Sequence, residues 1–513
     1  MNERIRLLVI GAEQDMSCYT IPEDVAITYS SSVVKEEEIE KAQIILLTRK
    51  IQEKELESLL KKASSYHISA IKHCLISDAE EAGVNHAIVP DNSAEHLLCQ
   101  QKCMEIMEPE QINEWLQLLS SRYWSGSGGA RIGIEWIHVS PFLRGSVHYN
   151  GHEGLVIEEN YGREPVPILS WRMNNIISKD KHSEEIYLVC RREDSVRCEL
   201  RITEIQSGSL DGFVESRTVP LPMEKPYEYE RERSVYLAIE MWAEGSGKIE
   251  VGPMHFRESR NGAGALIPGG VRHADVRGEE FFSYFDPMDC KPPLCVYFAG
   301  YHSAQDFEGY HMMRKFGAPF LLLTDPRLEG GSFYLGSEEY EAKVEQTIRD
   351  ALEKLGFTNE QLIMSGLSMG TYGAIYYGTR LQPHAIVIGK PLMNAGDIAA
   401  AERTVRPGDF DTSLDVLLSL EGRTDDSAVQ ALNDRMWNRF DRADFSKTKF
   451  AVAYMLQDDY DPKAYGDILE HQISDESNVY GKGMEGRHND NSSGINQWFR
   501  MQYDRILKED YGR

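Results

Sequence analysis

The sequence predicts an α/β protein with three regions, the middle one built from antiparallel strands. Three observations lead to this fold class. Short apolar runs alternate with stretches of helical period over about residues 4–100 and again over 261–513, as they do in βαβ units. Between them, over about 130–257, the apolar period changes to two, which is typical of antiparallel strands. A G-x-S-x-G motif in the last region stands between an expected strand and an expected helix.

The length and the charge limit what the chain binds. At about 100–200 residues per domain, 513 residues correspond to two to four domains. The 82 Asp and Glu against 55 Lys and Arg give a net charge of −27. Such a field repels nucleic acids and anionic lipid surfaces. We therefore expect no nucleic-acid partner, whereas a neutral sugar or a basic protein is compatible with this charge.

The lack of a recognisable targeting segment and the spacing of the cysteines point to the cytoplasm. The apolar residues 7–10 are too few for a signal peptide, and no run approaches the ~20 apolar residues of a membrane helix. None of the eight cysteines forms a C-x-x-C pair, which argues against a zinc site or a disulfide framework. We expect a cytoplasmic protein with no transmembrane segment, no metal and reduced thiols.

Residues 1–107 are predicted to form a small Rossmann-like α/β domain. Strands are expected at 5–10, 42–47 and, more weakly, 86–89, with helices at 36–41 and 52–63. Gly11 stands alone where a dinucleotide-binding motif needs G-x-G-x-x-G. A scaffold or docking role is therefore favoured over nucleotide binding.

Residues 108–129 are predicted to be a helix followed by a linker. Apolar residues recur at helical spacing over 108–122, and residues 125–129 are SGSGG. Glycine and serine in this pattern are typical of flexible connections.

Residues 130–260 are predicted to form an antiparallel β-sandwich of the jelly-roll, carbohydrate-binding type. Period-two runs are expected to be strands at 132–139, 185–191, 199–205, 235–242 and 248–256. Aromatic residues in such a domain can stack on sugar rings, although an aromatic in a strand more often packs in the core. The aromatic candidates are Trp171, Tyr187, Tyr236 and Trp242.

Residues 261–513 carry the chemical signal, in the segment QLIMSGLSMGTYGA. Residues 366–370 fit G-x-S-x-G between an apolar strand end and a helix of small residues, which is the context of a nucleophilic serine in an α/β-hydrolase domain. Gly366 and Gly370 let strand and helix close around a strained turn. The turn presents Ser368 at the positive end of a helix, where an oxyanion is stabilised.

The general base is predicted to be His488. The expected chain order is serine, acid, histidine, and three histidines follow Ser368. His384 precedes every plausible acid, and His471 lies in a helical stretch. His488 lies in a long loop rich in Gly, Asn and Ser ahead of a final helix at 495–508, which is where this fold places its base.

The acid is predicted to be Asp458, with Asp459 and Asp461 as rivals. These carboxylates directly follow an apolar strand at 450–456, and a carboxylate at this place can hold the imidazole tautomer and stabilise the imidazolium. Three acids in four residues also fit a solvated loop, so the sequence leaves the choice open.

Backbone N–H groups are predicted to form the oxyanion hole. Met369 supplies one donor as the residue after the nucleophile. The second is expected near Tyr301, in the loop after an apolar strand at 294–299. His302 in that loop either contacts substrate or is an ordinary polar loop residue.

The segments GSFYLGS (331–337) and GRHNDNSSGINQWF (486–499), the serine motif and the three-part layout together resemble the second accessory Sec protein family of streptococci and staphylococci. The resemblance spans essentially the whole chain. It implies an α/β-hydrolase-fold O-acetyltransferase that modifies N-acetylglucosamine on serine-rich-repeat glycoprotein adhesins and takes part in their export. It also places Ser368, Asp458 and His488 at the family's nucleophile, acid and base positions, although some members carry Glu where Asp458 stands.

The resemblance also implies partners and a donor. The partners are the two other accessory Sec proteins, the accessory SecA motor and the glycoprotein itself, with a peripheral place at the membrane through the translocase. No cofactor is expected to be tightly bound, and acetyl-CoA is the candidate acetyl donor, although no CoA motif is present. The residues alone leave two alternatives, a non-catalytic targeting scaffold and a plain carboxylesterase.

Overall fold

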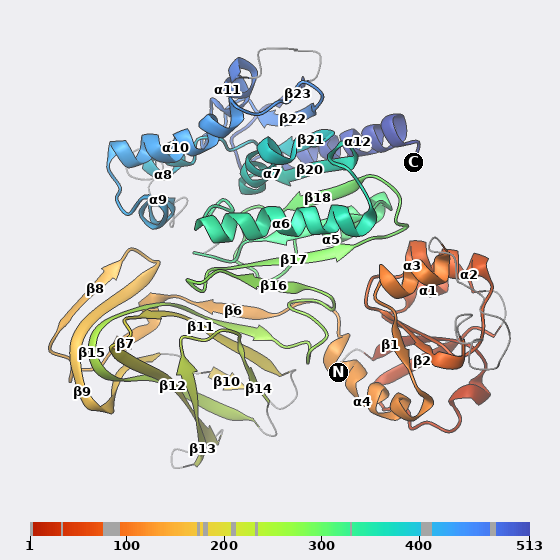
Figure 1. Cartoon of the computed structure of the whole chain (residues 1–513), viewed down its shortest axis with the longest axis horizontal. Helices are drawn as coiled ribbons and strands as arrows, with labels where there is room; N and C mark the ends of the chain where they lie inside the picture. The colour runs from red at the N-terminus through yellow and green to blue at the C-terminus, as the bar shows by residue number, and fades with distance from the viewer. Residues whose placement is uncertain are drawn as a thin grey trace.

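Three β-sheets, one after another along the chain, organise the protein (Figure 1). The computed structural model describes residues 4–31, 34–74, 93–171, 175–177, 183–206, 212–230, 234–328, 331–401, 413–471 and 479–513. The predicted strand at 86–89 lies outside these residues. The α/β fold class with an antiparallel middle region is confirmed.

The first sheet is parallel and has five strands in the order β2-β1-β3-β4-β5. Strand β3 begins at Ile44 instead of the predicted residue 42, because the N–H of Ala42 still caps the preceding helix by donating to the carbonyl of Glu38. The strands are β1 (Ile5–Ile10), β2 (Val25–Tyr29), β3 (Ile44–Leu47), β4 (Ile68–Ile71) and β5 (Glu105–Met107). The helices that pack with them are α1 (Glu36–Lys41), α2 (Glu53–Lys62), α3 (Ala94–Gln100) and α4 (Ile112–Arg122).

The segment predicted as a linker, 125–129, connects α4 to the second sheet, and a buried arginine contacts it. Arg260 is 1% exposed, and its guanidinium donates to the carbonyl oxygens of Trp124, at 2.7 Å, and of Gly126. The guanidinium also lies 3.5 Å from the centre of the Trp124 ring. The last linker residue, Gly129, already belongs to the next sheet.

The second sheet is antiparallel and has ten strands, all linked by hydrogen bonds. The two runs predicted at 235–242 and 248–256 form one strand, β15 (Val235–Glu258), which pairs first with β12 and then with β11. The run at 132–139 is interrupted by a 3-10 turn at Ile134–Trp136. The long strand β9 (Gly154–Trp171) was not predicted, since its interior contains two prolines and two charged clusters instead of a clean alternation.

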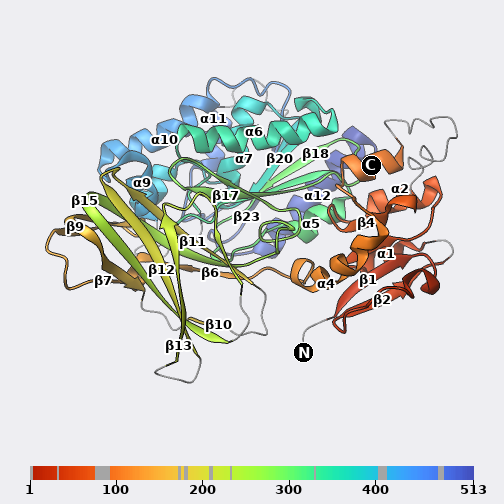
Figure 2. The same ribbon diagram turned by 60° about the horizontal axis from the view of Figure 1, so that its bottom comes forward.

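The sheet curls along β15 around one apolar core, to which strands from both its halves contribute (Figure 2). The remaining strands are β6 (Gly129–Ile132), β7 (Ile137–Val139), β8 (Ser146–Asn150), β10 (Asn175–Ile177), β11 (Glu184–Arg192), β12 (Val196–Gln206), β13 (Phe213–Leu221) and β14 (Tyr227–Tyr229).

The third sheet has eight strands in the order β16-β17-β19-β18-β20-β21-β22-β23. From β18 to β23 neighbouring strands are parallel, and the first two strands are antiparallel to their neighbours. The strands are β16 (Val271–Ala274), β17 (Glu280–Asp286), β18 (Leu294–Phe298), β19 (Phe320–Thr324), β20 (Leu362–Leu367), β21 (Ala385–Gly389), β22 (Lys449–Met455) and β23 (Val479–Met484). This is the strand order of an α/β-hydrolase domain, in which β18 and β19 exchange places relative to their order in the sequence.

Helices cover both faces of this sheet, so its central strands are buried on both sides. One face packs against α6 (Glu338–Leu355), α7 (Met369–Leu381), α10 (Asp426–Phe440) and α11 (Ala464–His471). The other face packs against α5 (Tyr310–Phe316) and α12 (Ser492–Tyr511). Two further helices, α8 (Ala395–Ala401) and α9 (Ser413–Glu421), stand between β21 and α10. None of the described helices has the length and apolar character needed to span a membrane.

A buried ionic cluster joins the first sheet's region to the third sheet. Asp286, at the end of β17, lies 3.4 Å from the ammonium of Lys102 and 3.7 Å from the guanidinium of Arg314. Both Lys102 and Asp286 are fully buried, and Asp286 also accepts a hydrogen bond from the Ser65 hydroxyl. Because an unpaired buried charge is costly, this cluster fixes how the two regions dock.

Candidate active site

The serine of the G-x-S-x-G motif occupies a strained turn between β20 and α7. Ser368 has φ 53° and ψ −124°, a conformation that is unfavourable for a residue with a Cβ atom. The surrounding structure holds it there, because the Ser368 N–H donates to the carbonyl of Gly389 at the end of β21 (2.9 Å). The predicted strand, turn and helix are all present.

The two motif glycines are required by close backbone approaches. A Cβ atom on Gly366 would lie 2.4 Å from the carbonyl group of Gly370, and one on Gly370 would lie 2.1 Å from the carbonyl oxygen of Phe298. Atoms at these separations overlap. The helix therefore begins in contact with the carboxyl ends of β18 and β20 only because both positions lack side chains.

His488 reaches the serine from the loop between β23 and α12. Its Nε2 lies 2.8 Å from Ser368 Oγ, and the side chain is 1% exposed. The His488 backbone N–H donates to a carboxylate oxygen of Asp459 at 3.0 Å, and the Tyr460 ring lies 4.3 Å from the imidazole, centre to centre. The loop after β22 thus contacts both the backbone and the ring of His488.

Asp458 is the aspartate that meets the far nitrogen of His488. Its Oδ2 lies 2.9 Å from His488 Nδ1, and its Oδ1 accepts the backbone N–H groups of Tyr460 and Asp461. The Asp459 carboxylate accepts the backbone N–H of His488, whereas Asp461 faces away, as described next. Of the three carboxylates left open by the sequence, Asp458 has the position of a triad acid.

Asp461 has a structural environment. It accepts backbone N–H groups from Met393 and Asn394, at 2.7 and 2.9 Å, and the Asn394 side-chain amide at 3.1 Å. Burial raises the pKa of Asp461, against the opposing effect of these hydrogen bonds. This carboxylate ties the loop after β22 to the chain that follows β21.

The predicted oxyanion donors lie at the same edge of the sheet as Ser368. Met369 is the first residue of α7, so its backbone N–H precedes the first hydrogen bond of the helix. Tyr301 follows β18 and is 38% exposed. The preceding Gly300 lies close to the backbone of Leu367, where an added Cβ would be 3.0 Å from the carbonyl oxygen. The loop of Tyr301 therefore passes directly beside the strand that carries the nucleophile.

The other histidines considered from the sequence have contacts of their own. His302 has its Nε2 3.4 Å from the hydroxyl of Thr324 on β19. His384 pairs with Asp510 at 2.8 Å. His471 pairs with Asp441 at 2.5 Å and stacks on Trp437. These contacts give the last two histidines structural roles on the surface of the domain.

Lys390 is a neighbour of the site that sequence reasoning missed. It follows Gly389 at the end of β21, is 7% exposed, and its ammonium lies 3.0 Å from the hydroxyl of Ser492. Burial lowers the pKa of Lys390, while the carboxylate of Asp458 acts in the opposite direction. The sequence does contain a signal that could have identified Lys390: it follows the strand next to the one that carries Ser368. The carboxyl ends of neighbouring parallel strands meet at one edge of a sheet.

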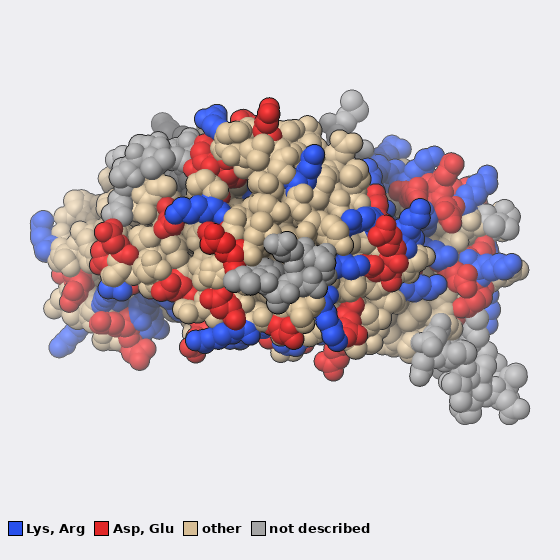
Figure 3. Space-filling model, turned by 90° about the horizontal axis from the view of Figure 1, so that it is seen from above, with Lys and Arg blue, Asp and Glu red and all other residues tan. Residues whose placement is uncertain are grey.

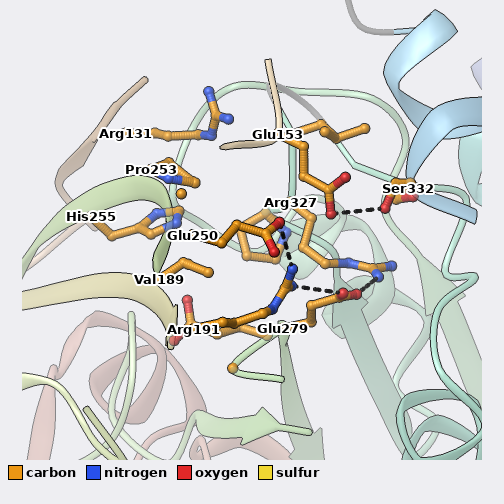
Figure 4. A pocket seen from close by; sticks show the side chains of 16 residues that line it. Arg131, Glu153, Val189, Arg191, Glu250, Pro253, His255, Glu279, Arg327 and Ser332 are labelled. Atoms are coloured by element: carbon orange, nitrogen blue, oxygen red, sulfur yellow. Dashed lines mark hydrogen bonds and ion pairs between the residues drawn. The ribbon is translucent and has the colours of Figure 1, made fainter. Parts of the chain in front are cut away.

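A small charged pocket lies between the second and third sheets (Figure 4). Its free volume is about 50 Å³. Arg191 bridges Glu250 and Glu279 at 3.1 and 3.2 Å, and Arg327 pairs with the same Glu279 at 2.8 Å. His255 forms part of the wall, and its Nδ1 has no hydrogen-bond partner in the described part of the chain. The paired charges hold the ten-stranded sheet against the loop that follows β19.

The site has the connectivity of a nucleophile, base and acid. An imidazole bonded to the serine can accept its proton, and a carboxylate on the other ring nitrogen stabilises the resulting cation. Backbone donors at a helix start can stabilise an oxyanion. Among the described residues, no group of three His, Cys, Asp or Glu side chains is arranged to hold a metal ion.

Comparison with known proteins places the chain in a family. The sequence model of the family described as "Accessory Sec system GspB-transporter" matches residues 5–513. The accessory Sec system protein of this kind from Staphylococcus aureus is 41% identical over 406 residues, which cover 79% of this chain and 77% of that protein. Its counterpart from Streptococcus gordonii is 41% identical over 399 residues, which cover 78% of each chain.

A solved structure shares the whole fold. A chain of the Glycosylation Associate Protein (Gap123) complex from Streptococcus agalactiae superposes with a TM-score of 0.85 at 33% identity, and the match covers 100% of both chains.

Proposed function

The chain belongs to the family of accessory Sec system GspB-transporters, and we propose that it is a serine-dependent O-acetyltransferase acting on N-acetylglucosamine of a serine-rich-repeat glycoprotein adhesin that this system exports. The observation that carries the enzymatic proposal is the contact of His488 with Ser368 on one side and Asp458 on the other. The sugar acceptor and the glycoprotein come from the family resemblance of the sequence.

The first half of the reaction forms an acetyl-serine. His488 Nε2 removes the proton of Ser368 Oγ, which attacks the acetyl carbonyl carbon of the donor. The oxyanion is stabilised by the Met369 N–H and by a backbone N–H near Tyr301. The tetrahedral intermediate then collapses, and His488 returns its proton to the departing donor group. For the proposed donor, acetyl-CoA, that group is the thiol of CoA.

The second half passes the acetyl group to the sugar. A hydroxyl of the acceptor gives its proton to His488 and attacks the serine ester, which restores free Ser368. Asp458 stays ionised throughout and stabilises the imidazolium in both halves. Water in place of the sugar would make the same site an esterase, so the acceptor decides between the two activities.

The chain is also proposed to work within an assembly. A homologous chain is part of the Gap123 complex. By analogy we propose that this protein assembles with the two other accessory Sec proteins, meets the accessory SecA motor, and works in the cytoplasm and peripherally at the membrane through the translocase. In this view acetylation of the glycoprotein precedes its export.

The test is co-expression with the glycosylated adhesin, followed by mass spectrometry of the glycans and measurement of export. We expect Ser368→Ala to abolish glycan acetylation, whereas the control Ser427→Ala, on an exposed residue at the start of α10, retains it. Unchanged acetylation in Ser368→Ala would refute the enzymatic proposal.

The same strains separate the two alternative functions. Loss of acetylation with normal export in Ser368→Ala, together with loss of export on deletion of the gene, assigns a separate scaffold role to the rest of the chain. Rapid turnover of a small acetyl ester without any sugar acceptor favours a plain carboxylesterase.

A further inference from the structure

The outward face of the ten-stranded sheet carries a row of side chains that runs across four strands. Strand pairing places Pro167 of β9 next to Trp242 of β15, Trp242 next to Glu199 of β12, and Glu199 next to Pro220 of β13. Paired residues on neighbouring strands project to the same side of a sheet. The residues before and after Trp242 on β15 are buried in the core, so this row faces outward.

Charged pairs lie on both sides of Trp242 on the same face. Glu240 pairs across the strands with Arg201, and Glu244 pairs with Arg197. The Arg201 guanidinium lies 3.6 Å from the centre of the Trp242 ring, and the indole N–H donates to Glu240 at 3.2 Å. Arg197 and Glu244 form an ion pair at 3.1 Å. The indole is thus fixed within a set of polar groups whose charges cancel.

Two hollows flank this row. The larger has a volume of about 360 Å³, and its lining includes Trp242, Arg192, Arg197, Glu199 and Glu244. The smaller has a volume of about 200 Å³, and its lining includes Pro167, Ser170 and Glu240. Because Pro167 pairs with Trp242 and Glu240 accepts its indole N–H, the hollows adjoin along the row. These two hollows, which lie on either side of the Trp242–Pro167 pair, are here together called the Trp242 groove.

The chemistry of the Trp242 groove matches one ligand class. An aromatic ring and proline rings offer apolar faces to the C–H groups of a sugar ring. Guanidinium and carboxylate groups donate to and accept from hydroxyls and amides, and a few such groups fix the orientation of a ligand. Arg192, Arg197 and Arg201 balance Glu199, Glu240 and Glu244, so the groove does not select a charged ligand.

We infer that the Trp242 groove is a binding site for neutral saccharides, separate from Ser368. The choice of N-acetylglucosamine units as the natural ligand rests on the proposed function. Bound there, the glycan of the substrate is held by the ten-stranded sheet while another of its sugars reaches the serine. Of the other aromatic candidates from the sequence, Trp171 and Tyr187 are buried in the core.

The test is binding of triacetylchitotriose to the full chain, followed by tryptophan fluorescence and by saturation-transfer NMR. We expect saturable binding by the unchanged protein and at least ten-fold weaker binding by Trp242→Ala. Tyr149→Ala, on an exposed aromatic of β8 that lines neither hollow, is the matched control and should bind normally.

A second variant guards against misfolding of Trp242→Ala. Arg197 is 85% exposed, so Arg197→Gln should keep the melting temperature while weakening binding several-fold. Normal binding by both variants, or tighter binding of a sulfated disaccharide than of triacetylchitotriose, would overturn the inference.

Ser368→Ala separates this inference from the proposed function. It should bind triacetylchitotriose as tightly as the unchanged protein, because the groove does not use the serine. If the unchanged protein transfers acetyl groups but binds no saccharide in the groove, the groove inference fails alone. If saccharide binding is present and acetyl transfer is absent, the proposed function fails and the groove stands.

Discussion

At the scale of single residues, the position of the nucleophilic serine at the sheet edge requires a strained backbone conformation. Ser368 keeps a positive φ because its N–H bonds to Gly389 and because the flanking glycines leave room for the helix. Such strain persists only where the surroundings determine the conformation, and it is frequent at functional sites. The G-x-S-x-G motif identified Ser368 because the two glycines that the turn requires can be read directly from the sequence.

Replacing each loop aspartate by asparagine should separate three roles. Asp458→Asn should lower kcat by about ten-thousand-fold with little change in stability, because asparagine favours the wrong imidazole tautomer. Asp459→Asn should lower kcat far less, since its carboxylate meets the backbone N–H of His488 and not the imidazole. Asp461→Asn should cost about 1–3 kcal/mol of unfolding free energy. Steady-state kinetics and thermal melts of the three variants check this, and equal effects on kcat would contradict it.

Gly366→Ala should destabilise the protein through overlap at the nucleophile turn. Its Cβ would meet the backbone of Gly370 at 2.4 Å, and such overpacking costs about 1–3 kcal/mol. Chemical denaturation measures the loss. Gly466→Ala in α11 is the control, because nothing lies within 4 Å of its Cβ position, and it should stabilise the helix by up to about 1 kcal/mol. Equal stability of the two variants would argue against the close approach.

Sequence reasoning found the side chains of the site but left the acid ambiguous. Ser368 and His488 stand out by motif, order and loop composition, whereas three aspartates share one loop. Which of them turns toward the imidazole depends on the N–H groups that each one accepts, and Asp461 is drawn away by Met393 and Asn394 from a different part of the chain. Lys390 was missed for the same reason, because its neighbours come together only in the folded sheet.

At the scale of elements, regular strands and helices were predictable and their interruptions were not. The strand at 5–10 and the helix at 36–41 have the predicted limits, because continuous apolar runs and helical spacing are local signals. Two separate strands were predicted where β15 is continuous, since the period-two pattern breaks around Gly245 and Gly247, both of which have positive φ. Pairing with β12 on one edge and β9 on the other keeps the strand continuous through this bend. No local sequence pattern reveals these partners.

The segment at 122–129 should become mobile when Arg260 is replaced. Arg260→Met removes the donors to the Trp124 and Gly126 carbonyls and the stacking on the Trp124 ring. We expect faster cleavage in this segment under limited proteolysis and a loss of about 1–3 kcal/mol, because the two carbonyls lose a charged hydrogen-bond donor. Arg197→Met, on an exposed arginine of β12, should leave the cleavage pattern unchanged. Identical proteolysis of Arg260→Met and the unchanged protein would show that the segment is held by other contacts.

For the molecule as a whole, the sequence carries a net charge of −27. On the face in Figure 3, basic and acidic side chains lie interspersed. The ionic groups with the largest structural effect are instead those buried where the sheets meet. They come from regions far apart in the chain, so composition and local pattern do not reveal them.

Lys102→Met should strongly destabilise the chain, because it leaves Asp286 buried with one cation fewer. Breaking such a pair costs about 3–5 kcal/mol. Adding Asp286→Asn should recover part of the loss, since the uncompensated charge is then removed. Urea denaturation of the two single variants and the double variant gives the coupling energy. Additive losses would mean that the two side chains do not interact.

Acid should weaken the contact between the second and third sheets. Burial lowers the pKa of His255 to about 3, and the cations of Arg257 and Arg131 act in the same direction, against Glu280 and a hydrogen bond with Gln305. The unfolded chain binds this proton near pH 6.5. The stabilising effect of neutral His255 is therefore complete above pH 6.5 and is lost as the pH falls toward 3, by on the order of 5 kcal/mol.

His255→Gln checks this pH dependence, because glutamine does not titrate in this range. Unfolding free energies measured from pH 7 to pH 4 should fall less steeply in the variant than in the unchanged protein. Parallel curves would assign the acid sensitivity to other groups.

The hydrogen bond from the Glu258 N–H to the Gly128 carbonyl, at 2.9 Å, joins the entry and the exit of the ten-stranded sheet. The polypeptide leaves the sheet beside the point where it came in, so the sheet is topologically an insertion. A short peptide bridge between these two points would excise the strands and leave the flanking chain almost uninterrupted. The ten-stranded sheet is thus inserted, at a single junction, into the chain ahead of the α/β-hydrolase-like domain.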